Sequence, residues 1–234
     1  MKPEKPTLEP NGVHLWLIDL TKPQPVVLSA DEQERADRFK VQPPRKQFVT
    51  TRSALRLLLA YYLDSQPLDI EFEYADHGKP NIRHPDTTLQ FNVSHAKECA
   101  LIAIADSFPI GVDIEWLERK TDTNALSKRF YSVAEQQQLG KLPADQRHRA
   151  FLNLWTQKEA FLKAQGSGLS RDTRTFSVST AGGLLADERQ PAAAEKWTIR
   201  TLIPAPGYCA AVAAPAADIV IRQFTHTIDL HPPG

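Results

Sequence analysis

The chain of 234 residues carries no excess charge of either sign, because 28 lysines and arginines balance 28 aspartates and glutamates. Proteins that coat a nucleic acid or lie on an anionic membrane typically carry a basic excess. The balance argues against such bulk binding, so we expect neither a nucleic-acid partner nor a membrane partner. Any phosphate group must instead be bound at a local site.

Cysteine is scarce, with Cys99 and Cys209 as the only two, and each stands in a short run of small apolar residues. Such positions are typical of buried free thiols in strands. No group of cysteines and histidines has the spacing of a structural zinc site. The pair Cys99-Ala100 is echoed by Cys209-Ala210, which is compatible with two similar halves divided within 106–109.

Long apolar stretches are also missing from the sequence. No run approaches the roughly 18 residues that a membrane span needs. The N-terminal segment lacks the continuous apolar core of a signal peptide. We therefore expect a cytoplasmic protein.

The pattern of apolar and turn-forming residues predicts an α+β chain in which helices and strands follow in mixed order. Ser29 and Glu32 have the spacing of a capping box, which predicts a helix that continues to Arg38. Further helices are expected at 47–63, 123–130, 133–140 and 146–165. Strands are expected at 13–20, 70–74, 89–93, 100–105, 110–116, 174–179, 197–203, 208–214 and 218–224.

The strand Gly111-Val112-Asp113-Ile114-Glu115 carries two acids in alternate positions. Side chains alternate between the faces of a strand, so Asp113 and Glu115 point to the same side. Two neighbouring carboxylates repel each other unless a cation or hydrogen-bond donors lie between them. Oxygen ligands of this kind suit Mg²⁺, with Mn²⁺ as the alternative. An exposed strand face wetted by two acids is the competing interpretation.

A second set of charges lies on the predicted helix 146–165. Its apolar stripe contains Lys158, and Glu159 lies on the flank of that stripe with Lys163 one turn beyond. Charges this close to a core-facing stripe are costly unless they are paired or liganded. The alternative is a surface pair of Glu159 with Lys163, beside a Lys158 that reaches out to solvent.

A hydroxyl and an imidazole follow each other at Ser94-His95, in the loop expected after the strand 89–93. Such a pair invites a serine-hydrolase interpretation. Neighbouring side chains at a strand end diverge, however, and no G-x-S-x-G elbow is present. A histidine that contacts a phosphate is the better interpretation.

Two further groups of basic residues are candidates for phosphate binding. The turn Gly78-Lys79-Pro80 fixes a lysine. A second basic cluster lies around the start of the helix 47–63 and consists of Arg45, Lys46, Arg52 and Arg56. The alternative interpretation is that these are ordinary solvated surface charges.

Taken in this order, the motifs resemble those of the Sfp-type 4'-phosphopantetheinyl transferases. The resemblance covers roughly residues 38 to 180. It is carried by Arg38-Phe39, Gly-Lys-Pro at 78–80, Phe-Asn-Val-Ser-His at 91–95, Gly-Val-Asp-Ile-Glu at 111–115, Arg-Phe-Tyr-Ser at 129–132, Trp-Thr-Gln-Lys-Glu-Ala-Phe-Leu-Lys at 155–163 and Gly-Ser-Gly-Leu at 166–169.

The resemblance implies a monomeric pseudo-dimer of two similar α+β halves, at 1–107 and 108–234, with the metal site in the second half. The prolines clustered near the C-terminus separately predict a flexible C-terminal tail. It implies an enzyme that transfers the 4'-phosphopantetheine group of coenzyme A, bound between the halves, to a serine hydroxyl. The acceptor is an apo carrier protein of the acyl, peptidyl or polyketide type, which becomes the holo form. Adenosine 3',5'-bisphosphate is released, and the reaction depends on Mg²⁺.

The family's functional residues can be carried over position by position. Asp113, Glu115 and Glu159 correspond to the metal ligands, and Glu159 is also the candidate to take the proton of the serine. His95 and Lys163 correspond to catalytic contacts with the phosphates of coenzyme A. The other coenzyme A contacts implied are Lys79, Pro80 and Ser94 near the nucleotide, and Arg45 and Arg52 at the 3'-phosphate, where the choice of arginine stays open.

The carrier protein is expected to be acidic around its serine. We predict that it docks on an exposed aromatic pair, Phe130 and Tyr131, in an otherwise polar stretch. Two rival interpretations remain open. A metal-dependent nuclease also uses paired acids with a later Lys-Glu, and a carrier-binding module without activity has the same fold.

Overall fold

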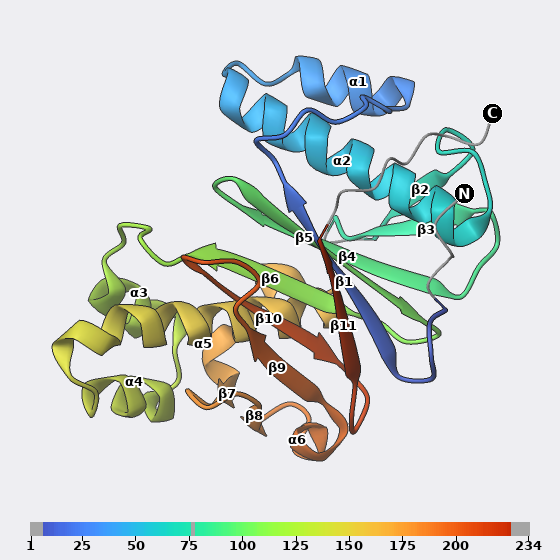
Figure 1. Cartoon of the computed structure of the whole chain (residues 1–234). Coiled ribbons are helices and arrows are strands. Elements are labelled where there is room, and N and C mark those ends of the chain that lie inside the picture. The colour runs from blue at the N-terminus through green and yellow to red at the C-terminus, as the bar shows by residue number, and fades with distance from the viewer. Residues whose placement is uncertain (1–6, 76–77, 226–234) are drawn as a thin grey trace.

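Two sheets with the same internal strand order organise the chain, of which the computed structural model describes residues 7–75 and 78–225 (Figure 1). Their strands are β1 (Gly12–Asp19), β4 (Leu89–Ala96), β5 (Cys99–Asp106), β6 (Gly111–Trp116), β9 (Thr198–Leu202), β10 (Tyr208–Ala214) and β11 (Val220–Thr225). The first sheet has the order β11-β1-β5-β4 and the second the order β6-β10-β9. The strands β6, β10 and β9 therefore repeat the arrangement of β1, β5 and β4.

Each half also contains a helix of 22 residues and a two-stranded hairpin. In the first half these are α2 (Gln42–Leu63) and the hairpin of β2 (Glu71–Tyr74) with β3 (Pro80–His84). In the second half they are α5 (Ala144–Gln165) and the hairpin of β7 (Phe176–Val178) with β8 (Leu184–Asp187). The predicted α+β fold of two similar halves is confirmed. Cys99 begins β5, and Cys209 is the second residue of the equivalent strand β10. Both thiols are free, but only Cys209 is buried as expected, whereas Cys99 is partly exposed.

The remaining helices are α1 (Ala30–Asp37), α3 (Thr123–Phe130), α4 (Val133–Gly140) and α6 (Ala193–Lys196), with short 3-10 turns at Gly168–Ser170 and Thr173–Thr175. The predicted capping box at the start of α1 is present, because the Ser29 amide donates to the Glu32 carboxylate over 3.0 Å. The helix expected from Gln47 begins at Gln42 instead. Prolines occupy its first turn, where no backbone N–H is needed.

Three elements were not expected from the sequence. β3 begins with a proline and β8 is half exposed, so neither shows a clear period of two, and α6 has only four residues. The expectation that a loop carries Ser94 and His95 is wrong. β4 continues to Ala96, so both residues lie on the strand itself.

The two sheets pack face to face, and a long helix covers the outer face of each (Figure 1). Alternation along β5 and β10 builds these layers. The residues of β5 that pack toward α2 are Ala100, Ile102 and Ile104, whereas Leu101, Ala103 and Ala105 face the other sheet. The residues of β10 that pack toward α5 are Cys209, Ala211 and Ala213, whereas Ala210, Val212 and Ala214 face the first sheet. Small side chains at these positions allow the layers to approach closely.

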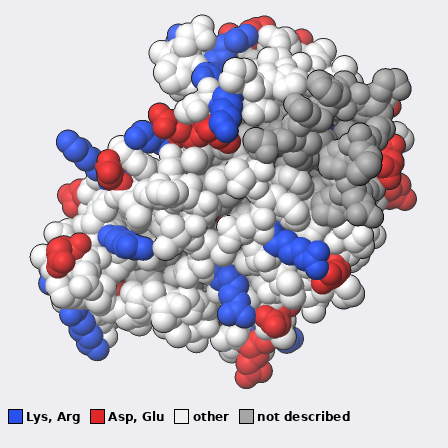
Figure 2. All heavy atoms as spheres, in the orientation of Figure 1, with Lys and Arg blue, Asp and Glu red and all other residues white. Residues whose placement is uncertain are grey.

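The last strand returns to the first half. β11 pairs in parallel with β1, from Gly12 opposite Val220 to Leu17 opposite Thr225. The division between residues 107 and 108 stays a prediction, and the tail expected to be flexible falls on 226–234, outside the described residues. None of the helices described is both long and apolar enough to cross a membrane. On the face drawn in Figure 2, basic and acidic side chains are interspersed, in keeping with the balanced composition.

Candidate active site

Asp113 lies where three structural elements meet. It belongs to β6, the residue is 6% exposed, and its Oδ1 atom accepts hydrogen bonds from Ser94 on β4 and from Lys163 on α5, each over 2.7 Å. The Lys163 ammonium also donates to the Ser94 hydroxyl over 3.0 Å. The structure therefore brings together residues 94, 113 and 163, which are far apart in the sequence and come from both halves.

The approach of α5 to β6 depends on Gly111. A Cβ atom on this residue would lie 2.0 Å from the carbonyl oxygen of Ala160 and 2.4 Å from the backbone nitrogen of Ala164. No side chain fits in this space, so the helix backbone rests directly on the strand. This contact brings Glu159 and Lys163 of the helix to the acidic face of β6.

The two other predicted metal ligands are electrostatically coupled to Asp113. Burial, and next the charge of Asp113, raise the pKa of Glu115 to about 7, although Glu115 pairs with Arg119. The same two causes raise the pKa of Glu159 to about 7, against the opposing effect of Lys163. Without a further cation, Glu115 and Glu159 are therefore partly protonated near neutral pH.

The fit of a divalent cation can be judged from these donors. Within the described residues, no three His, Cys, Asp or Glu side chains are already grouped to hold an ion. Asp113 and Glu115 are instead paired with Lys163 and Arg119. The Oδ2 atom of Asp113 is nevertheless buried without a hydrogen-bond partner. Mutually repelling carboxylates with an unsatisfied oxygen are the donor chemistry that Mg²⁺ takes, so these residues fit the ion.

Lys79 enters the site from the first half. Its ammonium donates to the carbonyl oxygens of Ile110, over 3.3 Å, and Ala164, over 3.4 Å. Burial lowers its pKa to about 8. The residue next to it, Pro80, opens β3 opposite Tyr74. Lys79 thus lies at the seam of the halves, beside the start of β6 and the end of α5.

His95 is the last residue but one of β4 and is exposed. Partial burial and then the charge of Lys163 lower the pKa of its imidazole, while Asp113 opposes them. A neutral imidazole next to Lys163 can either donate or accept a hydrogen bond, depending on its tautomer.

The basic cluster on α2 lies apart from Asp113. Arg45 pairs with Asp37 over 3.0 Å and remains partly exposed. Arg52 lies 3.5 Å from Glu32 and reaches the Tyr74 hydroxyl over 3.5 Å, and its Nη1 atom is buried without a partner. The interpretation of this cluster as solvated charge is wrong for Arg56, which is 2% exposed and binds Glu32 over 2.6 Å.

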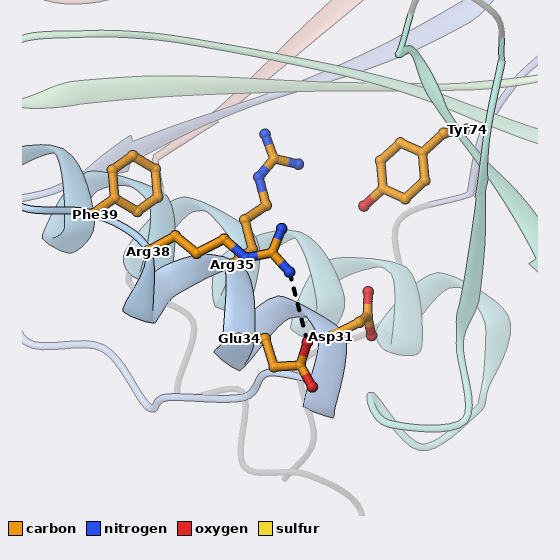
Figure 3. Close-up of a pocket in the computed structure, with 6 residues that line it drawn as sticks. All are labelled: Asp31, Glu34, Arg35, Arg38, Phe39 and Tyr74. Atoms are coloured by element: carbon orange, nitrogen blue, oxygen red, sulfur yellow. Dashed lines mark ion pairs between the residues drawn. The ribbon is translucent and has the colours of Figure 1, made fainter.

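A surface pocket of about 580 Å³, which the sequence motifs did not predict, lies near this cluster. Its lining consists of Asp31, Glu34, Arg35, Arg38, Phe39 and Tyr74 (Figure 3). Arg38 pairs with Glu34, whereas Arg35 extends into the space between Phe39 and Tyr74 and has no ion pair within the described residues. The signal available in the sequence was the position of Arg35 one helical turn before the Arg38-Phe39 motif.

Three sequence-based expectations for the second half are wrong. Tyr131 is fully buried and donates to the carbonyl oxygen of Phe151 over 2.7 Å, so it is no part of an exposed aromatic pair. Lys158 does not reach solvent, because it is 1% exposed and bound to Glu135 over 2.7 Å. Lys163 does not form a simple surface pair with Glu159, since it reaches Asp113 instead.

The sequence matches two protein-family models and is similar to characterised proteins along most of its length. Residues 109–213 match the family model described as 4'-phosphopantetheinyl transferase superfamily, and residues 24–107 match that described as 4'-phosphopantetheinyl transferase, N-terminal. The chain is 36% identical over 220 residues to the 4'-phosphopantetheinyl transferase HetI of Nostoc sp., covering 91% of each chain. It is 33% identical over 207 residues to the 4'-phosphopantetheinyl transferase Sfp of Bacillus subtilis, covering 82% of this chain and 89% of Sfp.

Proposed function

The chain belongs to the 4'-phosphopantetheinyl transferase superfamily, and from this premise we propose that it is a magnesium-dependent enzyme that loads apo carrier proteins with the phosphopantetheine of coenzyme A. The transferase activity follows from membership of this family. The arrangement that supports the finer assignment is the convergence of Ser94, Lys163 and Asp113 between the two halves.

In the reaction one phosphorus–oxygen bond forms and a different phosphorus–oxygen bond breaks. The serine hydroxyl oxygen of the carrier attacks the phosphorus next to pantetheine in coenzyme A. The bond from that phosphorus to the bridging oxygen of the pyrophosphate breaks, and adenosine 3',5'-bisphosphate leaves. Negative charge grows on the phosphate oxygens and on the leaving group, so stabilisation of charge is the main task of the site.

We assign the metal to Asp113, Glu115 and Glu159. Asp113 is buried, and Glu115 and Glu159 are half-buried. Burial and the charge of Asp113 raise the pKa of both glutamates, and a cation bound between the carboxylates would oppose this shift. Bound there, Mg²⁺ supplies Lewis-acid neutralisation of the phosphate charge. Mn²⁺ is the alternative ion with the same oxygen-ligand preference.

Lys163 and His95 are the proposed donors to the pyrophosphate. The ammonium of Lys163 is held on the site side of α5 by Asp113 and Ser94, so it can turn to an arriving phosphate over a short distance. Glu159, one helical turn earlier, is the proposed acceptor of the serine proton. A positioned carboxylate is a typical acceptor for the proton of an attacking hydroxyl group.

The nucleotide end of coenzyme A is assigned to the first half. Lys79 and Pro80 join the site to the hairpin of β2 and β3, and Tyr74 on that hairpin forms one wall of the Figure 3 pocket. We place the 3'-phosphate in this region with Arg45 and Arg52 as predicted ligands, and add Arg35 because it enters the pocket. All the groups needed come from one chain, which supports a monomer, and coenzyme A with apo carriers as substrates supports a cytoplasmic enzyme.

The decisive experiment incubates the protein with coenzyme A, Mg²⁺ and several apo carrier proteins of the acyl, peptidyl and polyketide types. Intact mass spectrometry of the carrier should show the gain of one phosphopantetheine, and the gain should vanish with EDTA and return with added Mg²⁺. No gain on any carrier would defeat the proposal. Cleavage of DNA or RNA in the same buffer would favour the nuclease, and carrier binding without a mass gain would favour the inactive module.

A further inference from the structure

The edge of β6 that faces the first half has no hydrogen-bonded strand partner in the described part of the chain, although β4 lies beside it. Its counterpart β1 has β11 at the equivalent edge. The N–H and C=O groups of an open strand edge require other partners when they are buried. In the first half the backbone groups at this edge of β1 are paired with β11, whereas in the second half those at the edge of β6 require partners other than a strand.

Polar side chains take the place of a strand along this edge of β6. The Val112 amide donates to Oδ1 of Asn92 over 2.9 Å, and the Ile114 amide donates to the Ser94 hydroxyl over 3.4 Å. The carbonyl oxygen of Val112 accepts from Lys163 over 3.2 Å, and that of Ile110 accepts from Lys79 over 3.3 Å. Asn92 and Ser94 lie on the same side of β4, two residues apart, as the period of a strand requires.

Asn92 differs from its neighbours in this row. Ser94 and Lys163 also bind Asp113 directly, whereas the contact of Asn92 that reaches β6 goes to the backbone at Val112. The Asn92 side chain is 7% exposed. Asn92 binds the N–H group of Val112 and Lys163 binds its carbonyl oxygen, so both backbone groups of the residue before Asp113 are held. These contacts fix the rotation of β6 about its own axis at this point.

We infer that Asn92 is a positioning residue for the proposed reaction: by accepting from the Val112 amide, it sets the direction in which the Asp113 and Glu115 carboxylates face the metal. This inference rests on the proposed function. Groups that orient metal ligands from behind typically change metal affinity about 10- to 100-fold when they are replaced. The expected loss is thus in metal binding and turnover, with little change at the carrier.

The test compares Asn92→Leu, which keeps the size but removes the acceptor, with Asn92→Asp, which keeps an acceptor oxygen. Gln90→Leu is the matched control, because Gln90 is a carboxamide on the same side of β4 with no hydrogen bond to β6 in the residues described. Mn²⁺ is titrated in the presence of coenzyme A without carrier and followed by electron paramagnetic resonance. Exchange of the Val112 amide is followed by NMR, and kcat and KM are measured for wild type and variants.

In Asn92→Leu we expect the Mn²⁺ dissociation constant to rise about 10-fold or more, kcat to fall, KM for the carrier to stay within about twofold, and the Val112 amide to exchange faster. Asn92→Asp should restore amide protection and metal affinity. An unchanged Mn²⁺ dissociation constant in folded Asn92→Leu, or an equal loss in Gln90→Leu, overturns the inference. If Asn92→Leu does not fold, Asn92→Ser, which is too short to reach Val112, takes its place. An inactive wild type with normal Val112 protection would defeat the proposed function instead.

Discussion

The Nζ atom of Lys163 lies 2.7 Å from Oδ1 of Asp113, and this ion pair ties α5 to β6 at the centre of the candidate site. Lys163 pairs with Asp113, and Arg119 pairs with Glu115. Burial, and next the charge of Asp113, still raise the pKa of Glu115 and of Glu159 to about 7. In this state Lys163 acts as the resident cation of Asp113, and an arriving metal and pyrophosphate would each take over one of its contacts.

Asp113→Asn should abolish transfer while leaving the protein folded. The amide keeps the shape and a hydrogen-bond acceptor for Lys163, but it removes the central charge of the proposed metal site. We expect kcat/KM to fall at least about 10²- to 10³-fold, the scale of losing one group that stabilises transition-state charge. The same change should lower the pKa of Glu115 and of Glu159, because each is raised in part by Asp113.

Steady-state transfer assays and carboxyl titration by NMR would measure these two effects. Asp122→Asn is a suitable control, because Asp122 is an exposed cap of α3 that accepts from the Ala125 amide. Wild-type turnover in Asp113→Asn would exclude this carboxylate from the chemistry.

The contribution of Glu115 and Glu159 to the stability of the metal-free protein should fall as pH rises from about 4.5 to 7. Both glutamates have a pKa raised from 4.5 to about 7, so the folded state holds protons that the unfolded state has released in this range. Their favourable contribution is complete below pH 4.5 and is lost as pH rises through 7. Each glutamate contributes on the order of 2 kcal/mol, at 1.36 kcal/mol per unit of pKa and with allowance for solvent screening.

Urea unfolding in EDTA at several pH values would measure this dependence. Between pH 5 and 8, the free energy of unfolding of the wild type should fall relative to that of the double variant Glu115→Gln, Glu159→Gln. The other groups that titrate in this range are present in both proteins, so they do not affect this difference. Added Mg²⁺ should stabilise wild type more at pH 8 than at pH 5 and should have little effect on the double variant. Parallel pH profiles for the two proteins would contradict the raised pKa values.

Tyr131→Ala should act on stability rather than on carrier recognition. The ring is fully buried and stacks on Phe151 with 5.0 Å between ring centroids, and its hydroxyl binds the backbone there. Loss of a buried aromatic ring costs about 3–5 kcal/mol. Tyr131→Phe, which loses only the hydrogen bond, should cost about 1–2 kcal/mol. Chemical denaturation measures both, and a raised KM for carrier with unchanged stability would restore the docking role that the structure removes.

Local patterns in the sequence were sufficient for the α+β class and for the common face of the two acids, whereas the fold of two similar halves was expected from the family resemblance. Alternation places Asp113 and Glu115 on one face of β6, and helical spacing places Glu159 one turn before Lys163. Motif order then placed Ser94 in the same family site. None of these signals states a distance, so the actual partner of Lys163 could be read only from the packing of α5 on β6.

The errors share a physical cause, which is the placement of polar groups by tertiary contacts. Tyr131 stands in a polar stretch, and its burial depends on a distant backbone carbonyl at Phe151. Lys158 is compensated by Glu135, 23 residues away in the sequence. The role proposed for Asn92 depends on the absence of a hydrogen-bonded strand at this edge of β6, a property of the sheet order that no local pattern contains.

The arginine that holds the 3'-phosphate can be identified by comparing two substrates. Arg35 lines the Figure 3 pocket, and Arg52 reaches the Tyr74 hydroxyl on its wall. We expect Arg35→Ala and Arg52→Ala each to raise KM for coenzyme A about 10-fold, in line with the loss of a charge-assisted contact. KM for dephospho-coenzyme A, which lacks the 3'-phosphate, should change little. Arg45→Ala is measured beside them, and a selective effect in that variant alone would move the site to the Asp37 end of α1.

Gly111→Ala should separate α5 from β6, the helix and the strand that carry the candidate site. A Cβ atom at this position would meet the backbone of α5 at 2.0 Å, and backbone atoms cannot rotate away as a side chain could. The helix must therefore move off β6, which separates Lys163 and Glu159 from Asp113. Overpacking of this kind costs about 1–3 kcal/mol or more, and we expect transfer activity to fall further than stability alone explains.

Gly140→Ala provides the matched control for this prediction. Gly140 ends α4, and a Cβ atom there meets nothing within 4 Å, so the substitution should be neutral or should stabilise by up to about 1 kcal/mol. Denaturation curves and transfer rates should be measured for both variants at a temperature where each is folded. Normal kcat in folded Gly111→Ala would mean that the contact of α5 with β6 does not set the distance between Lys163 and Asp113, and that the site tolerates a wider gap than its geometry implies.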